Sequence, residues 1–256
     1  NSYVECMDDL NRADTTMAAC VGDSSIALST IADDHLFVEV KAAYAKEMVT
    51  GFLKLNGMTV GAVANRSEIY DENGEKTASF DAALSPAGCD KAAEFVNFCD
   101  AFNIPVLTLT NVNGFTADKC SEKKIAKAAA RLTYAFANAT VPKVNVVTGM
   151  AYGSACVVMN SKALGADITY CWPDAKIGTM DARLAAKIIC DGQGADAVNE
   201  CAKEYEALQT SAASAARRGY VDTIIEPADT RKYVIGAFEM LFTKREDRPA
   251  KKHGTV

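Results

Sequence analysis

The sequence lacks the features that mark several classes of protein. It has no apolar run of about eighteen residues, the length that a membrane-spanning helix needs, and no basic-then-apolar leader of the secretory kind. Positive charge is scarce, because 27 Lys and Arg stand against 33 Asp and Glu, for a net charge of −6. No basic stripe is present. These absences argue against a membrane-spanning protein and against a nucleic-acid partner.

Histidine is rare in the sequence, and closely spaced pairs of cysteines are absent from it. The only histidines are His35 and His253, and the nine cysteines stand singly without a CxxC pair. An odd set of unpaired cysteines argues against a disulfide framework and against a metal ribbon. We expect most of them to be small apolar packing residues in a reducing cytoplasm. A nucleophilic cysteine needs a base partner, so we predict neither a metal site nor thiol catalysis.

The apolar pattern predicts one α/β domain. Apolar residues make up 49% of the 256 residues and charged residues 23%, which is typical of a globular protein. Strands and helices alternate, which favours βαβ units and a parallel sheet flanked by helices. Asn56-Gly57 predicts a hairpin turn, and residues 65–87 are expected to form a long loop. The predicted strands are 48–55, 58–64, 105–110, 143–148, 167–172 and 221–225, and the predicted helices are 89–102, 122–138, 149–164, 181–190, 195–208 and 230–243.

The most informative stretch is Thr148–Met159, where a strand ends, small residues follow and a helix begins. The first turn of a helix has unpaired N–H groups and partial positive charge, which suit a bound oxyanion. Ser85–Cys89, before another helix, would present a second set of amides, and two facing sets would make an oxyanion hole. Taken alone, a segment of either kind is more often a simple turn or cap than a ligand site. Acidic residues give no comparable signal, and Asp181 is expected to cap a helix.

Segments spread along the chain resemble the carboxyltransferase subunits of biotin-dependent acyl-CoA carboxylases and decarboxylases. This family includes propionyl-CoA carboxylase beta chains and the alpha chains of methylmalonyl-CoA and glutaconyl-CoA decarboxylases. The resemblance runs in order from about residue 30 to the C-terminus and covers the second of the family's two domains. The matching segments are Phe37–Val40, Asn56–Asn65, Ala87–Val96, Cys99–Thr108, Ala139–Val144, Ala151–Ala155, Leu164–Asp167, Trp172-Pro173, Arg218–Asp222 and Lys251–Gly254.

The resemblance implies a crotonase-like (ClpP/crotonase) spiral of ββα units, with a lead-in of residues 1–34 and a C-terminal carboxyltransferase domain of residues 35–256. It implies transfer of CO2 between carboxybiotin and a coenzyme A thioester, with this chain forming the biotin-side half of the site. The catalytic amides carried over from the family are those of Ser154, Ala155, Gly88 and Cys89. Biotin contacts are carried onto Gly153, Tyr152, Gly114 and Phe115, and the acyl contact onto Val157.

Partners are implied in the same way. The family works with a biotin carboxyl carrier protein and with an N-terminal carboxyltransferase domain or subunit that holds most of the CoA site. Its members form homo-oligomers from dimers to hexamers, and the sodium-pumping decarboxylases add a membrane subunit. Whether this chain serves a carboxylase, a decarboxylase or a transcarboxylase (a ligase or a transferase) stays open at this point.

Several positions depart from the family pattern. Asn111–Phe115 keeps only Gly114-Phe115 of a common Val-Pro-Gly-Phe turn, the Arg-His pair expected within 116–127 is missing, Gly149-Met150 replaces a basic pair, and Ser154 replaces a second glycine. Ser154 still supplies its amide, so these changes affect substrate identity more than reaction class. Two alternatives remain: a crotonase-type CoA hydratase or thioesterase, and a non-catalytic subunit for assembly or for docking the biotin carrier.

Overall fold

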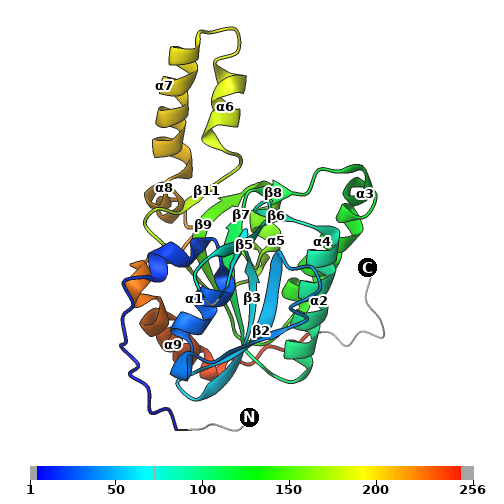
Figure 1. Ribbon diagram of the computed structural model, residues 1–256, viewed down its shortest axis with the longest axis vertical. Coiled ribbons are helices and arrows are strands. Elements are labelled where there is room, and N and C mark those ends of the chain that lie inside the picture. Colours follow the sequence, from blue (N-terminus) through cyan, green and yellow to red (C-terminus); the bar gives the residue numbers. More distant parts are fainter. Residues whose placement is uncertain (1–4, 72, 249–256) are drawn as a thin grey trace.

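The computed structural model describes residues 5–71 and 73–248, so the matching segment Lys251–Gly254 lies outside the described residues. One large sheet forms the centre, with strand order β1-β2-β3-β7-β9-β10-β12 and with β11 paired to the far end of β9 (Figure 1). The strands are β1 Phe37–Val40, β2 Met48–Leu55, β3 Met58–Asn65, β4 Glu68–Tyr70, β5 Lys76–Ser79, β6 Ala83–Leu84, β7 Val106–Val112, β8 Gly114–Phe115, β9 Lys143–Tyr152, β10 Ile168–Cys171, β11 Lys176–Gly178 and β12 Thr223–Ile224.

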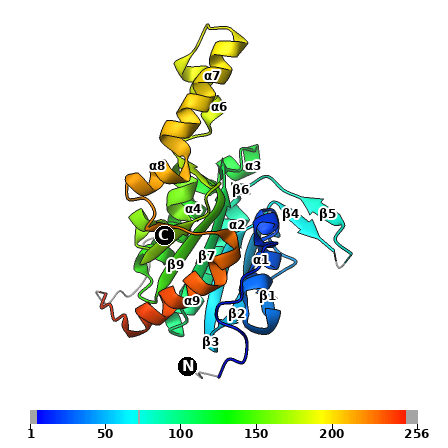
Figure 2. The ribbon, with the colours of Figure 1, turned by 90° about the vertical axis from the view of Figure 1, so that its left-hand side faces the viewer.

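Helices cover both faces of the sheet. The helices of the described residues are α1 Ser24–Ile31, α2 Pro86–Ala101, α3 Lys119–Glu122, α4 Ile125–Asn138, α5 Gly153–Val158, α6 Ala182–Ile189, α7 Ala195–Tyr205, α8 Ala212–Arg217 and α9 Thr230–Met240. α1 and α9 pack against one face and α2 and α4 against the other, so that each face has its own apolar core (Figure 2). No helix of residues 5–71 and 73–248 is long and apolar enough to cross a bilayer.

The predicted α/β class is confirmed. Strands β3, β7, β9, β10 and β12 run parallel, and β11 pairs with β9 in the same direction, as the alternation of strands and helices predicts. Near one edge β2 runs the other way and pairs antiparallel with both β1 and β3. The predicted hairpin is also confirmed: Leu55 pairs with Met58, and Asn56 and Gly57 turn the chain at φ 51° and 73°. Both residues are left-handed, as the favoured two-residue hairpin turn requires.

Three expectations about local structure differ from the structure. Residues 65–87 are not a plain loop, because β4 and β5 form an exposed ribbon and β6 joins a second small sheet. The helix expected over 122–138 is present but begins at Ile125, because residues 119–122 form a separate short helix, α3. The helix expected to reach residue 164 stops at Val158, and Asn160 then takes a left-handed φ of 52°. Short polar strands lack the alternating apolar pattern that would reveal them.

The N-terminal segment and α9 are joined by a buried ion pair. α1 places Ala27, Leu28 and Ile31 in the core, so this part of the predicted lead-in packs against the sheet. Beyond it, the Asp33 carboxylate lies 2.7 Å from the Arg231 guanidinium. Asp33 is 7% exposed and Arg231 only 1%. The pair therefore ties two segments nearly two hundred residues apart.

α6 and α7 form a helical hairpin that projects away from the sheet (Figures 1 and 2). Asp181 caps α6 as predicted, because its carboxylate accepts hydrogen bonds from the backbone N–H of Arg183 and Leu184. The two predicted helices of this region are confirmed within a few residues.

Candidate functional site

The site begins where β9 runs directly into α5. Tyr152 is still extended, with φ −112° and ψ 139°, and the next residue, Gly153, turns the chain with a φ of +60°. A Cβ at Gly153 would lie 3.2 Å from the carbonyl oxygen of Thr179. Glycine is needed here on both counts, since other residues rarely adopt this conformation and the space beside it is already filled.

The first turn of α5 carries no side-chain cap. The N–H groups of a first helical turn have no acceptor inside the helix, and here no N-cap oxygen takes that role. The backbone amides of Ser154 and Ala155 belong to this turn. They are therefore available to an oxygen that carries negative charge.

A cavity of about 800 Å³ opens beside this turn. Three of the predicted site residues, Gly153, Ser154 and Val157, line it from α5. The other walls come from the rest of α5 and the segment after it, from strands β9, β10 and β11, from the base of the α6–α7 hairpin and from the segment after α8. Their residues are Asn145, Val147, Cys156, Ser161, Lys162, Ala163, Thr169, Ile177, Gly178, Thr179, Tyr205, Gln209, Arg218, Gly219, Tyr220 and Val221. Among the residues that the structure describes, no Asp or Glu side chain lines this cavity.

Two predicted residues face away from the cavity and hold the turn in place. Ala155 is 1% exposed, and its methyl group belongs to the same core as Cys89. Tyr152 is 4% exposed, and burial, aided by the charges of Asp181 and Glu206, raises its pKa to about 12. The side chains of both residues are buried, and the Tyr152 phenol stays neutral. These two side chains therefore fix the backbone of the turn in place and do not contact a ligand in the cavity.

The retained pair Gly114-Phe115 lies beside α5. The two residues form β8, which pairs with β6 in parallel and contacts α5. Phe115 packs against the core that contains Ala155. The structure therefore brings this pair to the buried side of the helix start.

Asn111 is a residue of this region that the sequence pattern did not single out. Its Oδ1 accepts a hydrogen bond from the Met150 N–H at 3.0 Å, and its Nδ2 donates to the Val21 carbonyl at 3.2 Å. A Cβ at Gly149 would lie only 2.6 Å from this Oδ1. Asn111 and Gly149 thus fit each other at an irregularity in the β7–β9 pairing.

The second predicted set of amides is already engaged. The N–H of Gly88 donates to Ser85 Oγ at 2.9 Å, and the N–H of Cys89 donates to the Ser85 carbonyl at 3.0 Å. Ser85 Oγ in turn donates to Glu47. The start of α2 is a satisfied N-cap, so the α5 turn is the better placed of the two to receive a ligand oxygen.

Cysteine chemistry is disfavoured at the site. Burial raises the pKa of the Cys89 thiol to about 12 and that of Cys156, in the cavity wall, to about 11. At neutral pH both thiols keep their protons and are poor nucleophiles.

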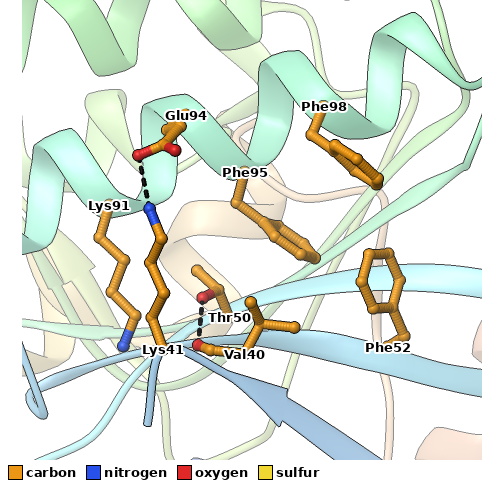
Figure 3. A pocket seen from close by; sticks show the side chains of 8 residues that line it. All are labelled: Val40, Lys41, Thr50, Phe52, Lys91, Glu94, Phe95 and Phe98. Carbon is orange, nitrogen blue, oxygen red and sulfur yellow. Dashed lines mark hydrogen bonds and ion pairs between the residues drawn. The ribbon is translucent and has the colours of Figure 1, made fainter. Parts of the chain in front are cut away.

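A second, smaller cavity of about 220 Å³ lies between α2 and strands β1 and β2 (Figure 3). Its apolar walls include three phenylalanines, with the rings of Phe52 and Phe95 5.0 Å apart, and the Lys41–Glu94 ion pair lies at one side. Lys91 of α2 also lines this cavity, and burial lowers its pKa to about 8. Its ammonium group donates to the carbonyls of Tyr44 and Ala45 before β2, and to that of Met48, the first residue of β2, at 2.6 Å. This lysine therefore has a structural role.

Comparison with known proteins gives a consistent result. A family model described as the carboxyl transferase domain matches residues 7–256. The chain is 42% identical to the methylmalonyl-CoA carboxyltransferase 12S subunit of Propionibacterium freudenreichii, over 89% of this chain and 43% of that subunit. It is 42% identical to the propionyl-CoA carboxylase beta chain of Saccharopolyspora erythraea, over 97% of this chain and 47% of the relative. The chain thus spans about half the length of the curated relatives it matches.

A solved structure of the transcarboxylase 12S hexamer, with hydrolysed methylmalonyl-coenzyme A bound, has the same fold. The two superpose with a TM-score of 0.89 at 39% identity, over 99% of this chain and 49% of the other. This likeness confirms the crotonase-like fold that the motifs implied.

Proposed function

The chain belongs to the carboxyl transferase domain family, and we propose that it forms the biotin-side half of an acyl-CoA carboxyltransferase site. The observation that carries this proposal is the uncapped first turn of α5 at the wall of the large cavity. An uncapped turn offers backbone amides where a charged oxygen needs donors. The relatives at 42% identity carry names for this chemistry.

The role of this chain follows from its amides. Bound carboxybiotin would supply the CO2 and a nitrogen base. The N–H groups of Ser154 and Ala155 would donate to the ureido oxygen as it gains negative charge, and the α5 dipole would add to that stabilisation. Because no carboxylate lines the described part of the cavity, the arrangement fits this chemistry better than that of a hydratase or thioesterase with an acidic side chain as base.

Val157 supports a non-polar acyl contact. It lies on α5 one turn beyond the amides, lines the cavity and is 42% exposed. An exposed apolar side chain at the wall of a cavity favours an alkyl group over a polar one. We assign Val157 to the acyl chain of the thioester.

Assembly with further subunits is part of the proposal. The projecting α6 exposes Leu184, Ile188 and Ile189 by 56%, 68% and 60%. Neighbouring apolar side chains this exposed are typical of a surface that another protein covers. The related 12S protein is a hexamer, and we propose that this chain also forms a homo-oligomer, meets an N-terminal carboxyltransferase domain and receives biotin from a carrier protein in the cytoplasm.

The experiment separates the amide of Ser154 from its side chain. Ser154→Pro removes the N–H within a first helical turn, where proline is tolerated, whereas Ser154→Ala keeps it. Loss of one oxyanion donor should lower kcat by about 100- to 1,000-fold in the proline variant and leave the alanine variant close to wild type. Ala195→Pro makes the same backbone change at the exposed start of α7 and serves as the control.

The assay follows CO2 transfer to free biotin from malonyl-, methylmalonyl- and glutaconyl-CoA, by the chain combined with a first carboxyltransferase domain. Thermal unfolding of each variant establishes that it is folded. Absence of biotin-dependent turnover with every thioester would overturn the function. Equal losses in Ser154→Pro and Ser154→Ala would overturn the assignment of the amide.

A further inference from the structure

The segment that joins α7 to α8 contributes to the wall of the large cavity, at the base of the projecting hairpin (Figure 1). Residues Glu206–Thr210 form one turn of π-helix, in which the Ser211 N–H donates to the Glu206 carbonyl at 3.0 Å. Turns of this kind are rare and occur frequently at functional sites. Gln209 of this turn lines the cavity, so the turn presents a carboxamide to a bound ligand.

The backbone of the π-helical turn is held firmly. Thr210 is fully buried and packs against Gly178, where a Cβ would lie only 2.7 Å from Thr210 Cγ2. On the other side, Ser214 Oγ donates to the Leu208 carbonyl at 2.6 Å. The residues on both sides of Gln209 are therefore fixed, which is what a side chain needs if it is to recognise a ligand.

The turn lies close to the uncapped amides of α5, and β11 connects the two. A Cβ at Gly178 would lie 3.6 Å from the Gln209 carbonyl oxygen, and one at Gly153 would lie 3.2 Å from the carbonyl oxygen of Thr179, the residue after Gly178. Gly153 is the first residue of α5, and all four residues line the same cavity. A ligand held by the α5 amides is therefore within reach of Gln209.

Arg218 determines which way the Gln209 carboxamide faces. The Nη2 of Arg218 donates to Gln209 Oε1 and to the Leu208 carbonyl, the latter at 3.4 Å. Because a guanidinium only donates, the amide oxygen faces Arg218, and Nε2 with its two N–H groups faces away from it. Within residues 5–71 and 73–248, these N–H groups have no acceptor. They are available to a ligand in the cavity.

The same arginine gives this wall of the cavity a positive charge. Arg218 lines the cavity, and its hydrogen bonds within the described part of the chain go to neutral oxygens. Lys162, the other cation of the lining, is paired with Asp222. A planar guanidinium beside a planar amide offers N–H donors that match a carboxylate, whose two oxygens lie in one plane.

We propose that Gln209 and Arg218 together bind the carboxylate of a malonyl-type acyl-CoA. This inference rests on the proposed carboxyltransferase function and names two residues that recognise its carboxylated substrate. One N–H of Gln209 and one of Arg218 donate to the carboxylate, near the amides of α5. Since hydrogen bonds to a charged acceptor are stronger than neutral ones, the pair should favour the carboxylated thioester over its decarboxylated counterpart by about 10- to 100-fold.

Calorimetric titration with two thioesters tests the proposal. The chain, combined with a first carboxyltransferase domain and without biotin, is titrated with malonyl-CoA and with acetyl-CoA, which lacks the carboxylate. Wild type should bind malonyl-CoA at least about tenfold more tightly. Gln209→Leu and Arg218→Met should each remove most of this preference and change the affinity for acetyl-CoA by less than about twofold. Gln193→Leu and Arg217→Met change exposed residues outside the cavity lining and should keep the preference.

A third variant separates donation from contact. Gln209→Glu can keep its bond to Arg218 but replaces the N–H donors by a second negative oxygen, so it should weaken malonyl-CoA binding at least as much as Gln209→Leu does. Equal losses for the two thioesters in Gln209→Leu would place the contact on the CoA portion that they share and overturn the proposal. Equal wild-type affinities for the two thioesters would also overturn it.

Turnover distinguishes this inference from the function on which it rests. In the CO2-transfer assay, Gln209→Leu should raise the KM for malonyl-CoA by about tenfold or more, whereas Ser154→Pro lowers kcat. Normal turnover together with equal thioester affinities would overturn the carboxylate site and leave the function standing. Absent turnover together with a preference for malonyl-CoA that Gln209→Leu removes would overturn the function and support the site.

Discussion

Replacing Asp33 by alanine should strongly destabilise this protein. The carboxylate accepts hydrogen bonds from the backbone N–H of Asn56 at 3.1 Å and of Gly57 at 2.8 Å, besides its 2.7 Å contact with Arg231. Breaking a buried ion pair leaves an uncompensated charge and costs about 3 to 5 kcal/mol. Asp8, 3.5 Å from Arg231, remains as a partner, so the lower end of this range applies.

The expected loss is therefore about 3 kcal/mol, equivalent to a drop in Tm of about 6 to 12 °C for a domain of this size. Urea unfolding followed by far-UV circular dichroism measures it. The control is Glu94→Ala, which removes an ion pair with Lys41 whose side chains are 71% and 44% exposed. That change should cost less than about 1 kcal/mol. Equal losses of unfolding free energy in the two variants would refute the claim that the buried ion pair between Asp33 and Arg231 stabilises the fold more than an exposed pair does.

The pH dependence gives a second check on the same variant. Burial raises the pKa of Asp33, but the hydrogen bonds from Gly57, Arg231 and Asn56 outweigh it, so the pKa lies below its ordinary 3.8. A carboxylate with a lowered pKa stabilises the fold fully above the ordinary value and loses that contribution as pH falls through the lowered one. The difference in unfolding free energy between wild type and Asp33→Ala should shrink below about pH 4. A difference that grows there would contradict this account.

Three further outcomes are expected. Gly153→Ala should cost about 1 to 2 kcal/mol by thermal unfolding because of its left-handed φ, whereas Gly236→Ala, inside α9 and with no atom within 4 Å of its Cβ, should cost nothing or stabilise. Thr230→Val leaves the buried Nε1 of Trp172, bonded at 3.0 Å, without its acceptor, so it should destabilise by about 1 to 3 kcal/mol and shift the fluorescence of the single tryptophan. The Cys89 thiol, with a pKa of about 12, should resist a disulfide-exchange reagent at pH 8 until the protein is unfolded; rapid labelling of the native protein would contradict its burial.

Local chemistry explains which elements were predictable. Asn56-Gly57 specifies its hairpin because both residues tolerate left-handed backbone, and the apolar faces of 86–101 and 125–138 reveal their helices. The helix cap at Asp181 was predictable because aspartate is a common N-cap residue and stands directly before the helical pattern. In each case the signal and its consequence lie within a few residues of each other.

Elements stabilised by distant contacts escaped prediction. The ribbon of β4 and β5 is polar and short, and its position is set partly by contacts to the N-terminal segment, such as the N–H of Glu68 donating to the Gly22 carbonyl at 3.0 Å. Asn111 gains its role only because β9 places Gly149 and Met150 against it. Such pairings depend on how strands align, which no single segment encodes.

The sequence by itself determined the α/β class, the family and the small-residue helix start at 153–155. The tertiary structure alone decided which amides are available, since Ser85 satisfies those of Gly88 and Cys89 while the α5 turn stays uncapped beside the cavity. The physical reason is that the partner of a backbone donor is set by three-dimensional proximity, which the chain reaches only after it has folded.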